Sequence, residues 1–358
     1  MLYIIFTTGQ CNLSCKYCGG SFPSDVVPWK VEYSVNDLRK FIEGDNSPVI
    51  AFYGGEPLLN SSFIQSVMDE IDFAKFVIQT NGLLVKHLPV RYWEMFDTIL
   101  LSIDGRREVT NYYRGYNVYE RVVEAARWLK SINVKADIIA RMTISERSDI
   151  YADVFHLLSL GVFDHIHWQL DVIWSDRWRD FDSWCTNSYK PGIKALIDLW
   201  VRNAINGKVL GFVPFLAVLR ALIFDEKLDS PPCGAGFSSV AIVTNGSVIA
   251  CPIAVDAKWA YLGNIFENCW KDVFGGRFIG EPCVSCSYFD LCGGRCLYAY
   301  YERFWGDDGF KKVCSLTCFM IDELKKISGK ILKLMMNGVI DPNSLRYPPF
   351  NNTTELIP

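Results

Sequence analysis

Thirteen cysteines, gathered at short spacings in two parts of the chain, constrain this sequence more than any other feature. Three of them, Cys11, Cys15 and Cys18, follow directly after the apolar run Leu2–Phe6. The N-terminus lacks the basic segment and the long apolar run of a signal peptide, so we expect a cytoplasmic protein. In a reducing cytoplasm, such spacings favour metal or iron–sulfur ligation over a disulfide framework.

The composition indicates a folded globular chain. Its 358 residues, half of them hydrophobic, correspond to roughly two domains of about 150 residues. The formal charge of −4 provides no global cationic field, so we expect neither nucleic acid nor a membrane as a partner. The most apolar stretch, Val209–Phe224, is interrupted by Pro214 and Arg220 and is shorter than the roughly 20 residues that cross a bilayer. It is interpreted as a buried helix.

The first half of the chain alternates short β-branched or aromatic runs with helical patterns. Ser34, with Asp37 three residues later, has the pattern of a capped helix start. Six runs are predicted to be buried strands: Leu2–Phe6, Pro48–Tyr53, Phe76–Ile78, Thr98–Ile103, Val134–Ile144 and His165–Leu170. Consecutive βα units predict an α/β fold with a parallel sheet, and such sheets bind their ligands at the carboxyl ends of the strands.

We expect four parts along the chain. Residues 1–186 form the α/β domain, and residues 187–230 form a helical bridge. Residues 231–320 contain most of the other cysteines and a hairpin signal at Asn245-Gly246, so this loop-rich α+β module needs metal sites for stability. Residues 321–358 complete a closing helix, Met320–Met336, and continue as a tail from Asp341.

The number of cysteines in the first group indicates its chemistry. A structural zinc site takes four protein ligands, and no fourth ligand is near Cys11, Cys15 and Cys18. Three thiolates on a four-iron cluster instead leave one iron open to a further ligand. The tight loop after the first strand therefore predicts an open cluster, with a structural zinc loop as the alternative.

The loop resembles the defining CxxxCxxC motif of the radical S-adenosylmethionine (radical SAM) superfamily, in which an aromatic residue, here Tyr17, precedes the last cysteine. Three further segments at strand ends are similar to superfamily motifs: Gly54-Gly55-Glu56, Gln79-Thr-Asn81-Gly82 and Ser102-Ile-Asp104-Gly105. The resemblance implies a partial (β/α)6 barrel that cleaves SAM to a 5′-deoxyadenosyl radical. It implies SAM-binding roles for Tyr17, Gly54, Gly55, Glu56, Asn81, Ser102 and Arg141. For Arg141, the alternative to SAM binding is a structural ion pair. For Asp104, a ligand role and a turn with Gly105 are both open.

The second cysteine group resembles the SPASM extension of radical SAM enzymes, which holds two auxiliary [4Fe-4S] clusters. The resemblance assigns Cys233, Cys251 and Cys296 to a proximal cluster, and Cys283, Cys286, Cys292 and Cys314 to a distal cluster. The proximal cluster then has a vacant iron or a fourth ligand from elsewhere, for which Cys269 and Cys318 are candidates. The alternative for both is a small buried hydrophobic residue. Two zinc ribbons are the competing interpretation, because Cys283-x2-Cys286 alone is typical of zinc. With the first loop, we expect three [4Fe-4S] clusters.

The layout resembles an archaeal group of peptide-modifying radical SAM enzymes, which implies oxidation or cross-linking of a peptide or protein side chain. Such an oxygen-sensitive enzyme needs a reducing electron donor, such as ferredoxin or flavodoxin. The anaerobic sulfatase-maturing branch places an aspartate base where this chain has Pro252. Asp256 is the nearby candidate, and a solvated loop aspartate is the alternative that we favour for it. Alternatives are an oxidoreductase that matures a haem or other small redox cofactor, and a non-catalytic iron–sulfur electron carrier.

Overall fold

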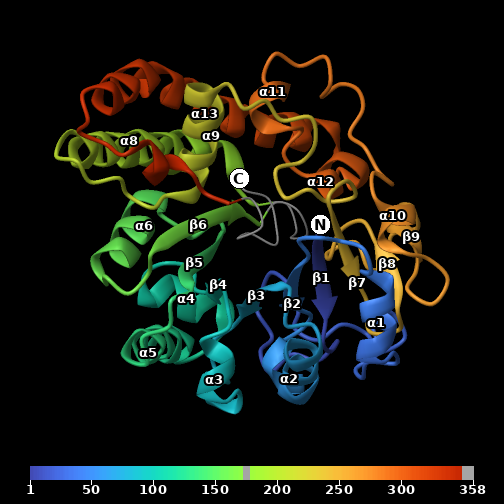
Figure 1. Ribbon diagram of the computed structural model, residues 1–358. Coiled ribbons are helices and arrows are strands. Elements are labelled where there is room, and N and C mark those ends of the chain that lie inside the picture. Colours follow the sequence, from blue (N-terminus) through green and yellow to red (C-terminus); the bar gives the residue numbers. More distant parts are fainter. Residues whose placement is uncertain (172–177, 349–358) are drawn as a thin grey trace.

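A computed structural model describes residues 1–171 and 178–348. Within this part of the chain a nine-stranded sheet has the order β6-β5-β4-β3-β2-β1-β7-β8-β9 (Figure 1). The six predicted strands are all present and parallel, as β1 (Leu2–Phe6), β2 (Val49–Tyr53), β3 (Lys75–Thr80), β4 (Thr98–Ser102), β5 (Asp137–Ile144) and β6 (His165–Leu170). The bounds of β1 and β6 are those predicted, and the other four differ only at their ends.

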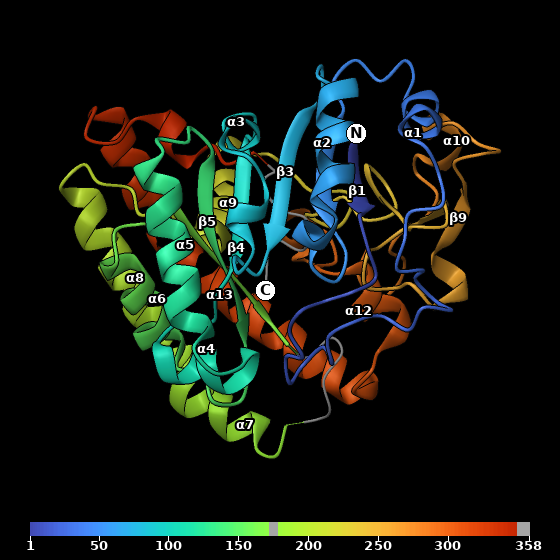
Figure 2. The same cartoon turned by 90° about the horizontal axis from the view of Figure 1, so that it is seen from below.

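Helices cover the outer face of the curved sheet, as Figures 1 and 2 show. Ser34 caps the first helix, because its side chain accepts from the backbone N–H of Asp37 and the Asp37 carboxylate accepts from Ser34 in return. The connecting helices are α1 (Val35–Phe41), α2 (Ser61–Glu70), α3 (Val90–Trp93), α4 (Arg107–Arg114), α5 (Val118–Ser131) and α6 (Ile150–Ser159), with short turns η1 (Pro57–Asn60) and η2 (Val85–His87). This arrangement confirms the α/β class and agrees with a partial barrel.

The cysteine-rich region continues the same sheet. β7 (Ser239–Ile242) pairs in parallel with β1, and β8 (Ser247–Ile249) and β9 (Tyr261–Asn264) follow antiparallel. The predicted hairpin is confirmed, with Gly246 at φ +85° in its turn. The two cysteine regions are therefore joined by backbone hydrogen bonds across one sheet, while the four-part division of the chain stays a prediction.

Two helices differ in extent from the expected ones. The apolar helix α9 begins only at Val213, because Pro214 lacks a backbone N–H and fits the first helical turn. The closing helix, α13, begins at Gly306, well before Met320. It packs on α8 (Lys190–Ile205) and α9 (Val213–Phe224). The remaining helices are α7 (Phe181–Trp184), η3 (Cys185–Tyr189), α8 (Lys190–Ile205), α9 (Val213–Phe224), η4 (Lys258–Ala260), α10 (Trp270–Val273), α11 (Phe289–Cys292), α12 (Leu297–Glu302), α13 (Gly306–Met336) and η5 (Pro342–Leu345).

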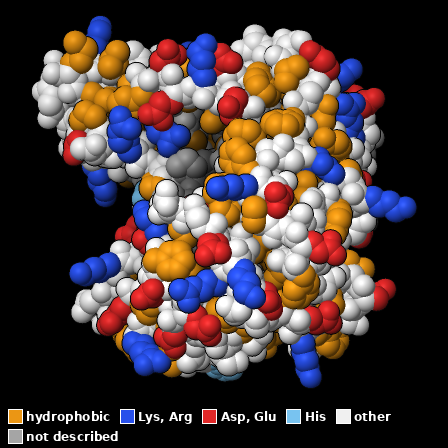
Figure 3. Space-filling view, turned by 45° about the vertical axis from the view of Figure 1, so that its right-hand side comes forward, with side chains coloured by type: hydrophobic (Ala, Val, Ile, Leu, Met, Phe, Trp, Pro, Cys, Tyr) orange, Lys and Arg blue, Asp and Glu red, His pale blue; other side chains and the backbone are white. Residues whose placement is uncertain are grey.

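The surface carries charges of both signs. On the face in Figure 3, Lys and Arg side chains alternate with Asp and Glu side chains. Among the described residues, no helix combines the length and the apolar character that a membrane span requires.

Residues 342–348, the described part of the expected tail, pack against the barrel instead. They include η5, and the side chains of Leu345 and Tyr347 are buried. Arg220 of α9 donates from Nη1 to the carbonyl oxygen of Tyr347 at 2.8 Å. The Tyr347 ring lies edge-on to the His165 ring at the start of β6, with 5.1 Å between centroids. The sequence signal missed this packing because a single aromatic residue among prolines and asparagines has no periodicity.

We expect Tyr347→Ala to lower the free energy of unfolding by about 3 kcal/mol, because a large buried ring leaves a cavity. The matched control is Tyr116→Ala, since Tyr116 is 94% exposed, and it should change stability by no more than about 0.5 kcal/mol. Denaturant unfolding followed by circular dichroism under anaerobic conditions measures both. Equal effects of the two substitutions would contradict the packed position of the segment.

Candidate active site

The carboxyl ends of the parallel strands surround a cavity of about 390 Å³. Every residue that the sequence predicted for SAM binding or for the first cysteine group lines it: Cys11, Cys15, Tyr17, Cys18, Gly54, Gly55, Glu56, Asn81, Ser102 and Arg141. Their convergence is an observation, whereas the role of each stays a prediction. The cavity wall also contains Leu13, Gly20, Phe22, Tyr53, Gln79, Thr80, Arg114, Thr143, Gln169 and Ile253.

The two loops after β1 and β2 approach each other with backbone contacts. The parallel ladder continues past the strands, where Gly55 N–H donates to Thr8 O at 3.1 Å and Glu56 N–H donates to Gln10 O at 2.8 Å. A Cβ atom at Gly54 would lie 2.3 Å from Thr8 O, and one at Gly55 would lie 2.1 Å from Gln10 O. Only glycine fits at these two positions, so they place the Glu56 turn directly beside the start of the cysteine loop.

Glu56, in the turn after β2, is bonded to the end of β3 and, through Asn81, connected to the cysteine loop. Its carboxylate accepts hydrogen bonds from Thr80 Oγ1 at 2.6 Å, Asn81 N–H at 2.8 Å and Leu58 N–H at 3.1 Å. Asn81 in turn donates from its side chain to Asn12 Oδ1 of the cysteine loop at 2.6 Å. Burial raises the pKa of Glu56 to about 7, although the three hydrogen bonds oppose this rise. The site therefore contains a carboxyl group that changes charge near neutral pH.

The cysteine loop presents three thiols to this cavity. Cys15 donates to Cys18, and this hydrogen bond lowers the pKa of Cys18 to about 6. The loop is closed by Cys11 N–H donating to Ser21 Oγ at 2.9 Å and by Gly19 N–H donating to Cys15 O at 2.9 Å. In residues 1–171 and 178–348, no three His, Cys, Asp or Glu side chains converge on a single metal position.

The donor set fits the cofactors that the motifs imply. Three soft thiols on one loop suit iron–sulfur ligation, and the same thiols border a cavity whose other walls include the polar side chains of Glu56, Asn81 and Arg141. A ligand with an amino and a carboxylate group would therefore meet both an open iron and hydrogen-bonding partners. The residues present fit a four-iron cluster together with SAM.

The wall opposite the cysteines is formed by β4, β5 and β6. Ser102 pairs in register with Arg141, and Thr143 pairs with Gln169. Arg141 is buried and donates from Nη2 to Gln169 Oε1. Gln169 and Thr143 were not predicted as site residues. The signal that could have identified them is strand alternation, because they share one face with Arg141 and Ser102.

The structure places Asp104 in the interior and Asp256 at the surface, which agrees with the solvated-loop alternative for Asp256. Asp104, expected in a turn or as a ligand, is fully buried and forms an ion pair with Arg114. The Asp256 side chain is exposed and is not among the cavity-lining residues. The cysteine-rich region contributes Ile253 to the cavity instead, two residues after Cys251.

Five cysteines of the C-terminal region form one group. Burial raises the pKa of Cys283 to about 11, and the nearby thiols of Cys314, Cys292 and Cys286 raise it further. Burial also raises the pKa of Cys318 to about 12, with the same three thiols as neighbours. Cys318, a candidate for the proximal cluster, therefore lies with the predicted distal ligands, one helical turn after Cys314 on α13.

The three cysteines predicted for the proximal cluster, Cys233, Cys251 and Cys296, lie on adjoining segments. Cys251 and Cys296 both raise the pKa of Tyr298, after the larger effect of its burial. The chain after Cys233 reaches the same place, because a Cβ atom at Gly236 would lie 3.0 Å from Leu297 and 3.3 Å from Ala250. The segments that carry Cys233, Cys251 and Cys296 thus come together, as a shared cluster requires, and their ligand roles stay predictions.

The raised pKa of Glu56 predicts a specific pH dependence of stability. The pKa of Glu56 is about 7 in the folded chain and 4.5 for a solvated glutamate, as in the unfolded chain. Between pH 4.5 and 7 the folded chain therefore binds more protons than the unfolded chain. The free energy of unfolding should therefore fall as pH rises from about 4.5 to 7, by on the order of 3 kcal/mol, and then level off. Glu56→Gln should remove this component, whereas Glu70→Gln, on the exposed end of α2, should not. Parallel pH profiles for wild type and Glu56→Gln in denaturant unfolding would contradict the buried carboxyl group.

Comparison with known proteins agrees with this geometry. The family model described as "Radical SAM superfamily" matches residues 5–150. The cysteine-type anaerobic sulfatase-maturating enzyme of Clostridium perfringens is 26% identical over 80% of this chain and 85% of its own length. A solved structure of native anSMEcpe with bound AdoMet and Cp18Cys peptide has a TM-score of 0.68 at 20% identity, covering 92% of this chain and 99% of that one.

A further relative establishes the family. The mycofactocin maturase of Mycolicibacterium smegmatis is 38% identical over 325 residues, which cover 82% of this chain and 77% of that protein. The matched region includes most of the chain, and the family model includes the cysteine loop and the glycine-rich turn beside it. By sequence, fold and site, this chain is a member of the radical SAM superfamily.

Proposed function

We propose that this protein cleaves SAM reductively and uses the resulting radical to oxidise or cross-link a side chain of a peptide or protein. Membership of the superfamily implies SAM and one [4Fe-4S] cluster, which together supply a 5′-deoxyadenosyl radical that abstracts hydrogen. The observation that carries the proposal is the group of three thiols, Cys11, Cys15 and Cys18, beside a cavity of about 390 Å³ that is also lined by polar side chains. An electron carrier without catalysis has no need of such a cavity.

The residues of this cavity take distinct parts in the proposal. The three thiols hold the cluster, and the turn of Gly54, Gly55 and Glu56 receives the amino group of SAM. Across the cavity, the Arg141 guanidinium and the Ser102 hydroxyl bind carboxylate or ribose oxygens. Tyr17 and Asn81, which also line the cavity, complete the SAM site. Buried apolar strands around these groups exclude water from a reactive radical.

Two auxiliary clusters belong to the same proposal. Cys283, Cys286, Cys292 and Cys314 hold the distal cluster, and Cys233, Cys251 and Cys296 hold the proximal one. The buried Arg295 lies near the distal thiols and lowers the pKa of Cys292, against the larger opposite effect of burial. A cation there favours thiolate ligands. These clusters exchange electrons with the reaction and with a donor such as ferredoxin or flavodoxin in an oxygen-poor cytoplasm.

The substrate class rests on the relatives. One is named for the maturation of sulfatases, and one solved structure of similar fold has a peptide bound together with AdoMet. The second candidate function, maturation of a small redox cofactor, is favoured by the mycofactocin maturase relative. Peptide modification is the better supported, because it is compatible with both kinds of relative. Since Asp256 is exposed, the proposal assigns no catalytic base to it.

Replacing Cys15 with Ala should abolish SAM cleavage. Reduced, iron-reconstituted wild type should release 5′-deoxyadenosine and methionine, and the variant should not, since two thiols hold the cluster poorly. The iron content of the variant should be about four atoms per chain lower than the roughly twelve atoms of wild type, because the auxiliary clusters remain. Cys185→Ala, which removes a buried thiol outside both groups, is the matched control and should keep activity and iron. Release of 5′-deoxyadenosine by Cys15→Ala at the wild-type rate would reject the assigned cluster site.

The substrate class can be tested by hydrogen transfer. Extracts of source cells grown in heavy water, divided into a peptide fraction and a small-molecule fraction, provide deuterated candidates. Because the radical abstracts hydrogen from its substrate, mass spectrometry should find deuterium in 5′-deoxyadenosine after incubation with the peptide fraction. The Cys15→Ala variant provides the blank. Enrichment with the small-molecule fraction alone would favour redox-cofactor maturation instead.

A further inference from the structure

A buried ion pair that the sequence did not predict lies beside the cysteine loop. Arg114 is the last residue of α4, and its side chain is 8% exposed. Asp104 follows β4 and is fully buried. The guanidinium donates from Nε to Asp104 Oδ2 at 2.8 Å and from Nη2 to Oδ1 at 2.7 Å. This two-bond geometry fixes the orientation of both groups.

The same carboxylate holds the middle of the cysteine loop. Tyr17, between Cys15 and Cys18, donates from its hydroxyl to Asp104 Oδ2 at 2.9 Å. The preceding residue, Lys16, donates from its backbone N–H to Tyr113 O of α4 at 2.9 Å. The rings of Tyr17 and Tyr113 are 5.9 Å apart. The loop is therefore attached to Asp104 and α4 at two successive residues.

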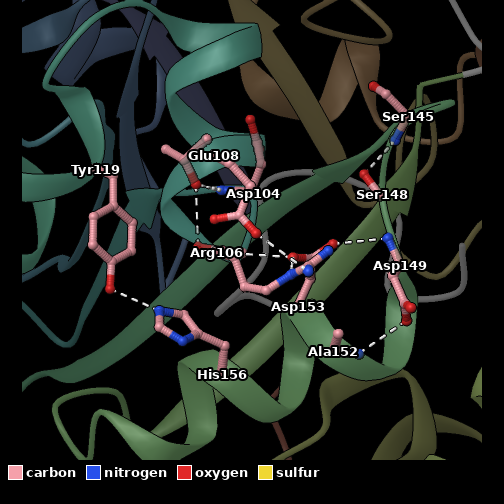
Figure 4. A network of polar contacts seen from close by, with 12 residues as sticks. Asp104, Arg106, Glu108, Tyr119, Ser145, Ser148, Asp149, Ala152, Asp153 and His156 are labelled. Atoms are coloured by element: carbon pink, nitrogen blue, oxygen red, sulfur yellow. Dashed lines mark hydrogen bonds and ion pairs between the residues drawn. The ribbon is translucent and has the colours of Figure 1, made fainter.

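The loop that carries Asp104 is itself anchored to α6, as Figure 4 shows. Arg106 donates from its backbone N–H at 3.0 Å and from Nε at 2.8 Å to Asp153 Oδ1. The buried Asp153 also accepts from Asp149 N–H at 2.9 Å, at the start of α6. Thr143 N–H of β5 donates to Asp104 Oδ1 at 2.9 Å. Movement of Asp104 would break these bonds together, so its position is rigid.

Arg114 also acts on the cysteines through its charge. It lines the cavity with the three thiols. Its guanidinium carbon lies 5.5 Å from the centroid of the Tyr17 ring, which stands between Cys15 and Cys18 in the loop. A buried cation acts strongly on nearby charge, because the low dielectric of the interior screens it little.

We propose that Asp104 and Arg114 are positioning residues for the cysteine loop, and that the Arg114 charge sets the reduction potential of the cluster bound there. This inference rests on the proposed function, since it requires the cluster at Cys11, Cys15 and Cys18. Reduction adds negative charge to a cluster that already carries thiolates. A buried guanidinium nearby favours the reduced form, and net charge is one of the determinants of cluster potential.

The test is a potentiometric titration of the reconstituted, full-length protein, followed by electron paramagnetic resonance with SAM present. Arg114→Met should lower the midpoint potential of the SAM-responsive signal, and Arg114→Lys should stay close to wild type because it keeps the charge. The double variant Arg114→Met with Asp104→Asn removes both charges of the pair, so its midpoint potential should lie between those of Arg114→Met and wild type. Arg147→Met is the matched control, because the Arg147 side chain is exposed and its guanidinium lies over the Tyr112 ring of α4, away from the ion pair.

Tyr17→Phe tests the positioning part, because it removes only the hydroxyl that Asp104 accepts. We expect SAM to bind about tenfold more weakly, as for a lost hydrogen bond to a charged group, with an unchanged midpoint potential. The matched control is Tyr112→Phe. Tyr112 lies on α4 with an exposed ring, so this variant should bind SAM as wild type does. Unchanged SAM affinity in Tyr17→Phe would overturn the positioning role.

The remaining outcomes are also decisive. A wild-type potential in Arg114→Met, or loss of the cluster from Arg114→Lys as well as from Arg114→Met, would overturn the role of the charge. So would a lysine variant as strongly shifted as the methionine variant. Iron at the cysteine loop in Arg114→Lys but in neither methionine variant would support the inference, because the charge is then needed to hold the cluster. Failure of the proposed function itself would be distinct, because wild type would then show no SAM-responsive signal.

Discussion

The site depends on the close backbone approach between the segment after β1 and the turn after β2. Two hydrogen bonds continue the parallel ladder beyond the strands, and side chains at Gly54 and Gly55 would collide with carbonyl oxygens of residues 8 and 10. This contact brings three thiols and the Glu56 carboxyl group to one cavity. A cluster ligand and its hydrogen-bonding partners can then meet at the carboxyl edge of a parallel sheet, where such folds bind ligands.

Other contacts hold this arrangement from two sides. Glu56 and Asn81 connect the cysteine loop to the end of β3, while Asp104 and Arg114 connect it to β4 and α4. The C-terminal region joins through β7, which pairs with β1 in the same sheet, and contributes Ile253 to the cavity. The two cysteine-containing regions therefore lie on one continuous sheet.

The sequence predicted what depends on local pattern. The strands β1 and β6 have the expected bounds, because buried parallel strands appear as short apolar runs. The cysteine loop and the glycine-rich turn were found by their spacing, and the structure brings them together. What depends on distant pairing was missed. Arg114 reaches the site from the end of a helix, Gln169 from a strand with no motif, and Tyr347 from an apparently irregular segment. Asp256 was placed by nearness in sequence alone, and it is exposed.

The central claim is that an iron atom held near Cys11, Cys15 and Cys18 has an open position that SAM occupies. Electron–nuclear double resonance on the reduced protein, with ¹⁵N in the amino group of SAM, tests it most directly. The account predicts a hyperfine coupling from that nitrogen, which disappears when unlabelled SAM replaces the labelled compound. A reduced cluster whose spectrum shows no nitrogen coupling and no change on addition of SAM would contradict it.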